Sequence, residues 1–322
     1  MKTKVSDDVK YASDLLRKNE LVAIPTETVY GLAGNIYSET AIRAIFQMKG
    51  RPLYNPLIVH IASRDQLNDF VINVPKVALK LADTFWPGPM TLVLEKKDNV
   101  PDLITAEKPT VAVRIPNHQL MLKLLANLDF PVAAPSANPF GRISPTKASH
   151  VVEYFDGKLK MVLDGGTCTK GIESTIIGFE NDKAVIFRLG SLSKDKIEQI
   201  TGPIQLKNKA ENNPVAPGML SRHYAPKTPF VVVENATQYC DTIESKKLAV
   251  LKFQETVSVI NNSIVKTIVL SDSGSFEEAA SNLYNAMHEL DSLKVDCIVA
   301  ELFPNTDLGT TINDRLRRAA KT

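Results

Sequence analysis

The sequence is poor in the residues that build disulfide scaffolds and metal cages. Only three cysteines occur among 322 residues, namely Cys168, Cys240 and Cys297, and none belongs to a CxxC pair. An odd number of widely separated cysteines argues against a disulfide framework or a zinc ribbon and favours a reducing compartment. The five histidines lack metal-ligand spacing as well. We therefore expect a cytoplasmic protein that provides no metal site of its own.

Long apolar runs and an excess of one charge are also missing. No run reaches the about 18 apolar residues of a membrane span, and the first ten residues carry two aspartates instead of the apolar core of a signal peptide. The 38 Lys and Arg nearly balance the 36 Asp and Glu, which disfavours a strongly basic nucleic-acid surface. With 44% hydrophobic and 23% charged residues, the composition is typical of a globular protein with no membrane association.

Several common catalytic motifs are absent. The chain contains no GxxxxGK[ST] phosphate loop, no GxGxxG, no HExxH and no GxSxG. Ser191 and Lys194 match SxxK, but the SDN and KTG partner motifs are missing, so Ser191 or Ser193 is better interpreted as a helix cap. A function in phosphate or acyl chemistry would have to use other residues.

Segments of strand and helix character alternate over the first two thirds of the chain. Helices are predicted at 6–19, 38–49, 75–85, 117–128 and 147–155. Strands are predicted at 21–24, 57–61, 90–94, 111–115, 131–134, 161–164, 174–179 and 184–188. This alternation predicts an α/β or α+β domain with a twisted sheet over residues 1–205.

The pattern breaks at about residue 206 and resumes at 230. Between them, Pro214, Pro217, Pro226 and Pro229 predict a stiff linker over 206–229. After it, strands are predicted at 230–234, 247–251, 265–270 and 296–300, with helices at 236–245, 275–292 and 313–321. Residues 230–322 are therefore predicted to form a small C-terminal α/β domain.

The first chemically suggestive feature is the pair of segments PTETVYGL at 25–32 and KGRPLYNPL at 49–57. Lys49 and Arg51 flank Gly50 at a predicted helix end, where two cations can simply offset the helix dipole. Pro52 and Pro56 make the segment rigid, however, and rigidity suits a preorganised anion site better than a solvated cap. We interpret this segment as an anion-binding site.

Further polar residues follow predicted strands. Ser136 and Asn138 in PSANPFGRISPT come directly after a strand, where α/β sheets commonly bind ligands, although both could cap their own turn. Arg114 and Arg188 end apolar strands and could merely extend to solvent. Together with the KxR pair and the hydroxyls around Glu173 in DGGTCTKGIESTII, they predict a site for a charged nucleotide and a small zwitterion.

The ordered set PTETVYGL, KxR followed by NPL, SAN and EST resembles the YrdC/YciO-type family. The linker segment PGMLSRHYAP and the extra domain are similar to the family's long two-domain form, the threonylcarbamoyl-AMP synthases, over essentially the whole chain. The resemblance implies an open twisted sheet of YrdC type around a large positive cavity, joined by the Pro-rich linker to a Rossmann-like C-terminal domain. It also implies that the linker, residues 206–229, acts as a lid.

The resemblance also implies residue roles. L-threonine would be held by Thr28, His60, Arg114 and Ser174. ATP would be contacted by Lys49, Arg51, Asn55, Thr110, Ser136, Asn138, Ser144, Arg188, His223 and Tyr224. Within this second set, Lys49 and Arg51 are expected to be catalytic, and no side chain is expected to ligate a metal.

By the same resemblance, the chain is expected to be a nucleotidyltransferase, an L-threonylcarbamoyladenylate synthase. It would join L-threonine, bicarbonate or CO2, and ATP carrying Mg²⁺, and release pyrophosphate. A separate transferase complex would then move the threonylcarbamoyl group to tRNA, which the chain itself could bind weakly. Two alternatives stay open: a noncatalytic double-stranded RNA or tRNA-binding module, and a phosphate-ester hydrolase or carbamoyl transferase using the same cavity.

Overall fold

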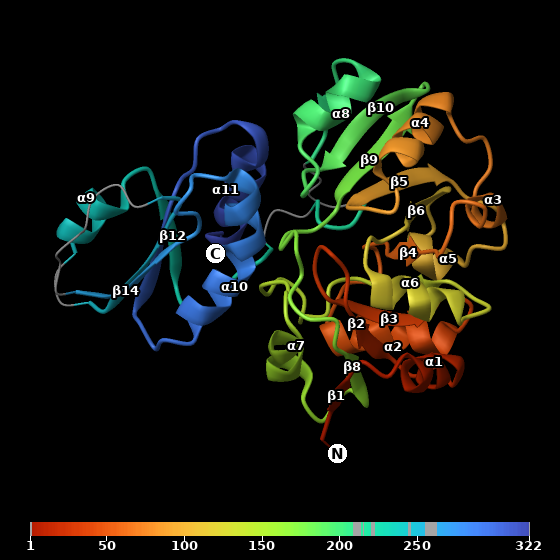
Figure 1. The fold of residues 1–322 in the computed structure, drawn as a ribbon, viewed down its shortest axis with the longest axis horizontal. Helices are drawn as coiled ribbons and strands as arrows, with labels where there is room; N and C mark the ends of the chain where they lie inside the picture. The colour runs from red at the N-terminus through yellow and green to blue at the C-terminus, as the bar shows by residue number, and fades with distance from the viewer. Residues whose placement is uncertain are drawn as a thin grey trace.

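The structure is a computed structural model that describes residues 2–208, 214, 216–219, 223–243, 246–254 and 263–321. Figure 1 shows a larger body built from the first two thirds of the chain and a smaller one built from the last third. The strands of the larger body are β1 (Lys4–Ser6), β2 (Val22–Ile24), β3 (Gly31–Asn35), β4 (Ile58–His60), β5 (Met90–Glu95), β6 (Thr110–Arg114), β7 (Val132–Ala133), β8 (Met161–Leu163), β9 (Thr175–Glu180), β10 (Lys183–Arg188) and β11 (Gln205–Leu206). Its helices are α1 (Val9–Arg17), α2 (Glu39–Lys49), α3 (Leu67–Phe70), α4 (Lys76–Phe85), α5 (Asp102–Thr105), α6 (Gln119–Ala126), α7 (Ala148–Phe155) and α8 (Lys194–Thr201).

In the described part of the chain, the larger body contains one mixed sheet of eleven strands in the order β1-β8-β2-β3-β7-β4-β6-β5-β9-β10-β11. This arrangement confirms the predicted α/β class with an open sheet. Strands β4 and β6 are parallel neighbours, and their register places His60 directly opposite Arg114. Because both residues end their strands, the sheet brings two predicted site residues together at one edge.

Both faces of the large sheet are covered by helices. On one face, α1 and α6 pack over apolar side chains of β2 and β8. On the other face, α2, α4 and α7 contribute to the largest apolar cluster, which includes Ile42, Leu81 and Val151. A smaller apolar patch, centred on Ile58 and Phe187, is covered by Ala216 and Met219 of the linker. The linker therefore packs directly onto the larger body.

Some helix ends were predicted correctly and others were not. Ser38 caps α2 by accepting from the Ala41 amide, and Gly50 ends it at φ +62°, as the sequence predicts. Helix α1 instead begins after Asp8, because Ser6 belongs to β1, which pairs with β8. Two further helix starts also differ from the prediction. Helix α6 is capped by His118 rather than Asn117, and the last helix begins six residues before the predicted position 313.

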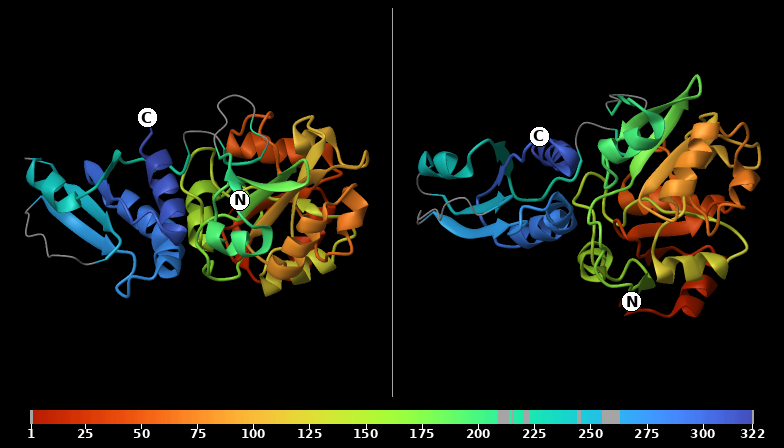
Figure 2. Two further views of the ribbon diagram at one scale, coloured as in Figure 1. Left: turned by 90° about the horizontal axis from the view of Figure 1, so that it is seen from above. Right: turned by 45° about the horizontal axis from the view of Figure 1, so that its top comes forward.

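The smaller body contains a parallel sheet in the order β12-β15-β13-β14, within the residues described. Its elements are β12 (Phe230–Val233), α9 (Ala236–Asp241), β13 (Leu248–Lys252), β14 (Ile264–Val269), α10 (Phe276–Asp291), β15 (Cys297–Glu301) and α11 (Asp307–Ala319). The predicted helix 236–245 extends into residues 244–245, which lie outside the described residues. Figures 1 and 2 show α9 on the outer face of this sheet and α10 and α11 on the face toward the larger body. No described helix has both the length and the apolar character that a membrane crossing requires.

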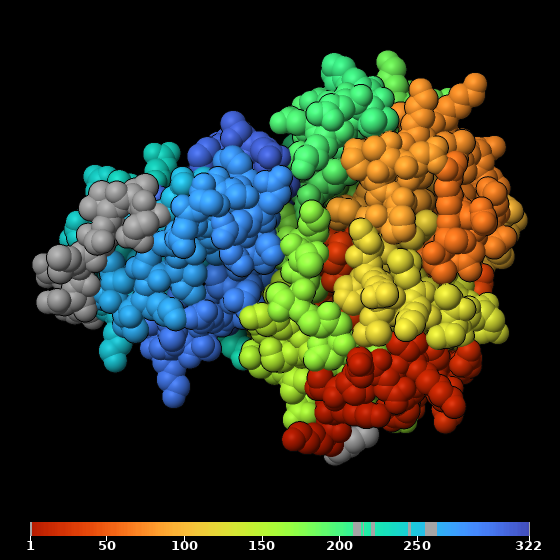
Figure 3. Space-filling model, in the orientation of Figure 1, coloured from red at the N-terminus to blue at the C-terminus, as the bar shows by residue number. Residues whose placement is uncertain are grey.

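The two bodies meet along a continuous contact, visible in Figure 3 between the blue C-terminal residues and the yellow-green residues of the larger body. Its centre is polar. Arg315 of α11, fully buried, donates through Nε to Glu173 at 3.1 Å and through Nη2 to the Leu189 carbonyl. Tyr284 of α10 donates to the same carboxylate at 3.0 Å. The predicted division at residues 205 and 229 stays a prediction, but the contact between the two bodies is tight.

We expect Arg315→Met to destabilise the protein strongly. The substitution keeps much of the side-chain volume but leaves the Glu173 carboxylate buried without its cation, which typically costs about 3–5 kcal/mol. Urea unfolding would measure the loss, with Arg317→Met, an exposed position on the same helix, as the control. Equal unfolding midpoints for the two variants would contradict the assigned importance of this ion pair.

Candidate functional site

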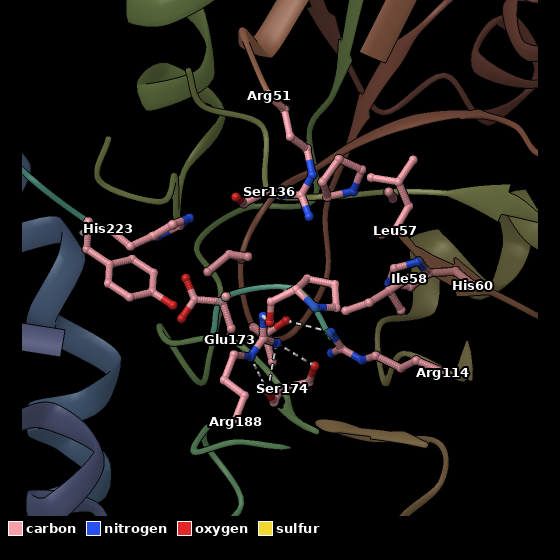
Figure 4. Close-up of a pocket in the computed structure, with 17 residues that line it drawn as sticks. Arg51, Leu57, Ile58, His60, Arg114, Ser136, Glu173, Ser174, Arg188 and His223 are labelled. Atoms are coloured by element: carbon pink, nitrogen blue, oxygen red, sulfur yellow. Dashed lines mark hydrogen bonds between the residues drawn. The ribbon is translucent and has the colours of Figure 1, made fainter. Parts of the chain in front are cut away.

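A cavity with an empty volume of about 540 Å³, including the space at its mouth, lies where the large sheet meets the linker. Figure 4 shows Arg114 and His60 on one side of it and Glu173 and His223 on the opposite side. The lining residues are Thr28, Val29, Arg51, Leu57, Ile58, His60, Arg114, Ala134, Pro135, Ser136, Glu173, Ser174, Arg188, Pro217, Gly218, His223 and Tyr224.

One end of the cavity is built on Arg114 and His60. Arg114 donates from Nη1 to Thr28 Oγ1 at 2.9 Å and from Nε to the Gly88 carbonyl at 3.2 Å. Among the described residues His60 has no hydrogen-bond partner at Nδ1, and burial together with the charge of Arg114 lowers its pKa to about 3. A neutral imidazole beside a guanidinium suits a small molecule that carries both a carboxylate and donor groups.

Two further cations, Arg51 and Arg188, line the rest of the cavity wall. Arg51 is buried and donates to Asn55 Oδ1 at 2.6 Å and to the Pro56 carbonyl at 2.7 Å. Burial and the charge of Arg188 lower the pKa of Arg51 to about 9, and burial lowers the pKa of Arg188. Since a buried cation without a counter-ion is costly, these groups indicate a site for an anionic ligand.

All four residues predicted to bind L-threonine line the cavity. Ser174 joins Thr28, His60 and Arg114 there, and its hydroxyl lies 2.7 Å from Thr91 Oγ1 and 3.1 Å from Arg188 Nη2. Of the predicted ATP residues, the cavity wall includes Arg51, Ser136, Arg188, His223 and Tyr224.

The other predicted ATP residues lie outside the cavity wall. Lys49 Nζ donates to the carbonyl of Ser136 and, at 2.6 Å, to that of Asn138, so it supports the loop from behind. Asn138 donates within its own loop, to the carbonyls of Pro139 and Arg142. As described above, Asn55 holds Arg51. Ser144 donates to Glu173 at 2.7 Å. Thr110 begins β6, at the opposite end of the strand from Arg114, and is paired with Glu95.

Two buried carboxylates are functional candidates that sequence reasoning did not single out. Glu173 lines the cavity, and although its burial would raise its pKa, Arg315 and Arg188 outweigh that effect and hold the pKa at about 2. Glu27 lies behind Arg114, with its Oε1 at 2.7 Å from Arg114 Nη2. Both residues stand inside motifs quoted above, PTETVYGL and EST, where a carboxylate next to hydroxyl residues was the available signal.

The linker closes one side of the cavity. Gly218 has φ +80°, and a Cβ there would lie 2.8 Å from Arg188 Cδ, so the approach requires glycine. The Tyr224 ring lies under the Arg315 guanidinium at 4.9 Å and stacks on Tyr284 at 5.5 Å. Within the part of the chain that the structure describes, neither the Tyr224 hydroxyl nor His223 Nδ1 has a hydrogen-bond partner, and burial lowers the pKa of His223 to about 3. Both side chains are thus neutral and available to a ligand.

Two family models cover nearly the whole chain. The Sua5/YciO/YrdC model, described as "Telomere recombination", matches residues 14–190. The Sua5 C-terminal model, described as "Threonylcarbamoyl-AMP synthase, C-terminal domain", matches residues 192–321.

Full-length relatives agree with these matches. The chain is 40% identical to the threonylcarbamoyl-AMP synthase of Bacillus subtilis, covering 97% of this chain and 92% of the relative. It is 42% identical to that of Pyrococcus abyssi, covering 97% and 94%. The crystal structure of P. abyssi Sua5 complexed with L-threonine superimposes with a TM-score of 0.89 at 39% identity, over 99% of this chain and 97% of that one.

The geometry predicts how the positive wall responds to substitution. Arg51→Ala should weaken the binding of pyrophosphate, used as a probe, by about 10- to 100-fold, the equivalent of one charge-assisted hydrogen bond. Titration calorimetry would measure this, with the exposed Lys10→Ala as a control for the loss of a cation elsewhere. Unchanged affinity in a folded Arg51→Ala protein would remove Arg51 from the anion site.

Proposed function

The chain belongs to the Sua5/YciO/YrdC family, and we propose that it makes L-threonylcarbamoyl-AMP from L-threonine, bicarbonate or CO2, and ATP, with release of pyrophosphate. The proposed reaction class is nucleotidyl transfer. The observation that carries the proposal is the division of charge within one cavity. Arg51 and Arg188 lie in its wall without a carboxylate within 4 Å among the described residues, whereas Arg114 has one.

The proposed chemistry requires positioning and charge neutralisation rather than a covalent nucleophile. The threonine ammonium first loses a proton to solvent. The amine nitrogen then bonds to the carbon of CO2, the electron pair of one C–O π bond moves to oxygen, and a second N–H proton passes to solvent to give a carbamate. A carbamate oxygen attacks the α-phosphorus of ATP in line, and the bond from that phosphorus to the bridging oxygen breaks. The electron pair leaves with pyrophosphate, whose growing charge faces Arg51 and Arg188.

We assign threonine to the end of the cavity formed by Thr28, His60, Arg114 and Ser174, with Arg114 on its carboxylate. ATP is assigned to the side of Arg51, Ser136 and Arg188. Lys49, Asn55, Asn138 and Ser144 act on ATP through the loops and side chains that they hold, and Thr110 is proposed as a more distant ATP contact. Mg²⁺ enters with ATP, because phosphate and water oxygens are the ligands that it prefers.

His223 and Tyr224 extend the proposal to the linker. Both side chains are buried at the cavity wall, and the linker is bound to the 141–142 loop through Ala225 N to Gly141 O at 2.8 Å and Arg142 Nη1 to Pro226 O at 2.9 Å. We propose that residues 206–229 act as a lid that shields the hydrolysable mixed anhydride from water. Residues 209–213, 215 and 220–222 of this segment lie outside the described residues.

The product is a mixed anhydride, which suits it as a donor for a second enzyme. We propose that a transferase complex passes its threonylcarbamoyl group to tRNA, and that this chain binds tRNA only weakly, since its net charge is +2. The three cysteines are buried and form no disulfide among the described residues, which supports action in a reducing cytoplasm.

Pyrophosphate release tests the proposed reaction. We expect release only when L-threonine, bicarbonate and ATP are all present, and loss of release in the Lys49→Ala/Arg51→Ala variant. Removing preorganised charge stabilisers of this kind typically costs about 2.7–4 kcal/mol in the transition state. Salt-sensitive RNA binding without pyrophosphate release would support the RNA-binding module instead, and consumption of carbamoyl phosphate without threonine would support the carbamoyl transferase.

Limited proteolysis tests the lid. ATP plus threonine should slow tryptic cleavage after Lys227, which is exposed next to the lid residues, because a filled cavity holds the linker in place. His223→Ala/Tyr224→Ala should abolish this protection, and although the loss of two buried rings lowers the melting temperature, both bodies should remain folded. Equal cleavage rates with and without substrates, combined with normal turnover of the double variant, would overturn the lid.

A further inference from the structure

The loop between β2 and β3 holds one buried carboxylate in a fixed position. Thr26 Oγ1 accepts from the amides of Thr28 at 3.1 Å and Val29 at 3.2 Å, and donates to the Val29 carbonyl at 2.7 Å. On the other side, the Lys170 amide donates to the Glu27 carbonyl at 2.7 Å. The backbone on both sides of Glu27 is therefore tied down, and its side chain is 5% exposed.

Glu27 acts on the cavity through Arg114. Its Oε1 lies 2.7 Å from Arg114 Nη2, and Arg114 is itself 5% exposed at the side chain. Thr28 and the Gly88 carbonyl take the other two sides of the guanidinium. Glu27 is not among the cavity-lining residues, whereas Arg114 and Thr28 are. The carboxylate thus lies outside the cavity wall, and its contact with the guanidinium is a charge pair without hydrogen-bond geometry among the described residues.

The ion pair also changes the charge of this end of the cavity. Within the described residues, Arg114 alone among the four predicted site cations, Lys49, Arg51, Arg114 and Arg188, has a carboxylate within 4 Å. The end built on Arg114 is consequently close to neutral, and the side built on Arg51 and Arg188 carries the surplus positive charge. A free amino acid is a zwitterion with no net charge, whereas a triphosphate is a polyanion.

We propose that Glu27 is a positioning and specificity-determining residue that reserves the Arg114 end for a zwitterionic amino acid and keeps phosphate groups out of it. This inference rests on the proposed function. Glu27 fixes the guanidinium for a carboxylate and cancels the charge that would otherwise attract any anion. Phosphate groups are then bound on the Arg51 side, and the two substrates do not exchange places.

Glu27→Gln separates these effects from simple packing, because it preserves shape and removes one charge. We expect the KM for threonine to rise about tenfold or more, in line with the cost of breaking a buried ion pair, while the KM for ATP stays unchanged. Inorganic phosphate should become a competitive inhibitor against threonine. In the original protein it should compete only with ATP.

Glu27→Asp provides the complementary arm, because it keeps the charge but shortens the side chain by one methylene. Its threonine KM should rise, since Arg114 is drawn back, yet phosphate should not compete with threonine. Glu39→Gln, which breaks an exposed surface pair with Arg43, is the matched control and should change neither quantity.

The outcomes decide between the alternatives. If Glu27 had only a structural role, both Glu27 variants would have a lower melting temperature, but the KM for threonine would not rise relative to that for ATP and phosphate would not compete with threonine. This result would overturn the inference. If Glu27→Gln does not fold, an unchanged threonine KM in Glu27→Asp would overturn it, and a raised threonine KM would support it. Absence of threonine binding and of turnover in the original protein would instead reject the proposed function itself.

Discussion

Burial of positive charge without matching negative charge is the constraint on which this molecule depends. Lys49, Arg51 and Arg188 are each less than a tenth exposed, and none has a carboxylate within 4 Å among the described residues. Such charges are costly in a protein interior unless carbonyls, amides or a ligand compensate them. Backbone carbonyls of the loops 49–57 and 135–146 compensate Lys49 and Arg51, and those of Ser174 and Pro217 compensate Arg188. The charges of Arg51 and Arg188 at the cavity wall therefore stay available to an anion.

Glu173 connects this charged cavity to the smaller body. Its carboxylate accepts from Ser144 of the cavity loop, Tyr284 of α10 and Arg315 of α11, so three elements far apart in sequence meet at one group. The residue that follows it, Ser174, accepts from Arg188. The smaller body therefore contributes to the position of cavity residues, although it supplies none of the predicted substrate contacts itself. Its contribution is electrostatic and mechanical.

Local sequence signals predicted local structure well. Ser38 and Gly50 bound α2 as capping rules require, and the alternation of apolar segments located most strands. Strand β3 was missed because its sequence, GLAGN, has two glycines and no β-branched residue. The start of α11 was missed because Gly309 and two threonines weaken the helical pattern of its first turns.

Site residues that belong to a recognisable motif were predicted. The site residues that were not predicted owe their importance to partners that lie far away along the chain. Glu27 and Glu173 gain their importance from Arg114 and Arg315, which lie 87 and 142 positions away along the chain, and no local pattern reports such a pairing. The residue roles themselves came from the family resemblance, since an isolated KxR pair is equally consistent with a helix cap.

Tyr224 shows how the constraints of charge and fold combine. Its φ of +68° is unfavourable for a bulky residue and costs of order 1–3 kcal/mol, so the surroundings must hold it there. Arg315 lies over the Tyr224 ring, and the Tyr284 ring stacks on the same ring. The Tyr224 hydroxyl has no hydrogen-bond partner among the described residues. The cation that pairs with Glu173 is thus the same one that holds the strained tyrosine. Arg315 of the smaller body therefore connects the linker, through the Tyr224 ring, to Glu173 of the cavity wall.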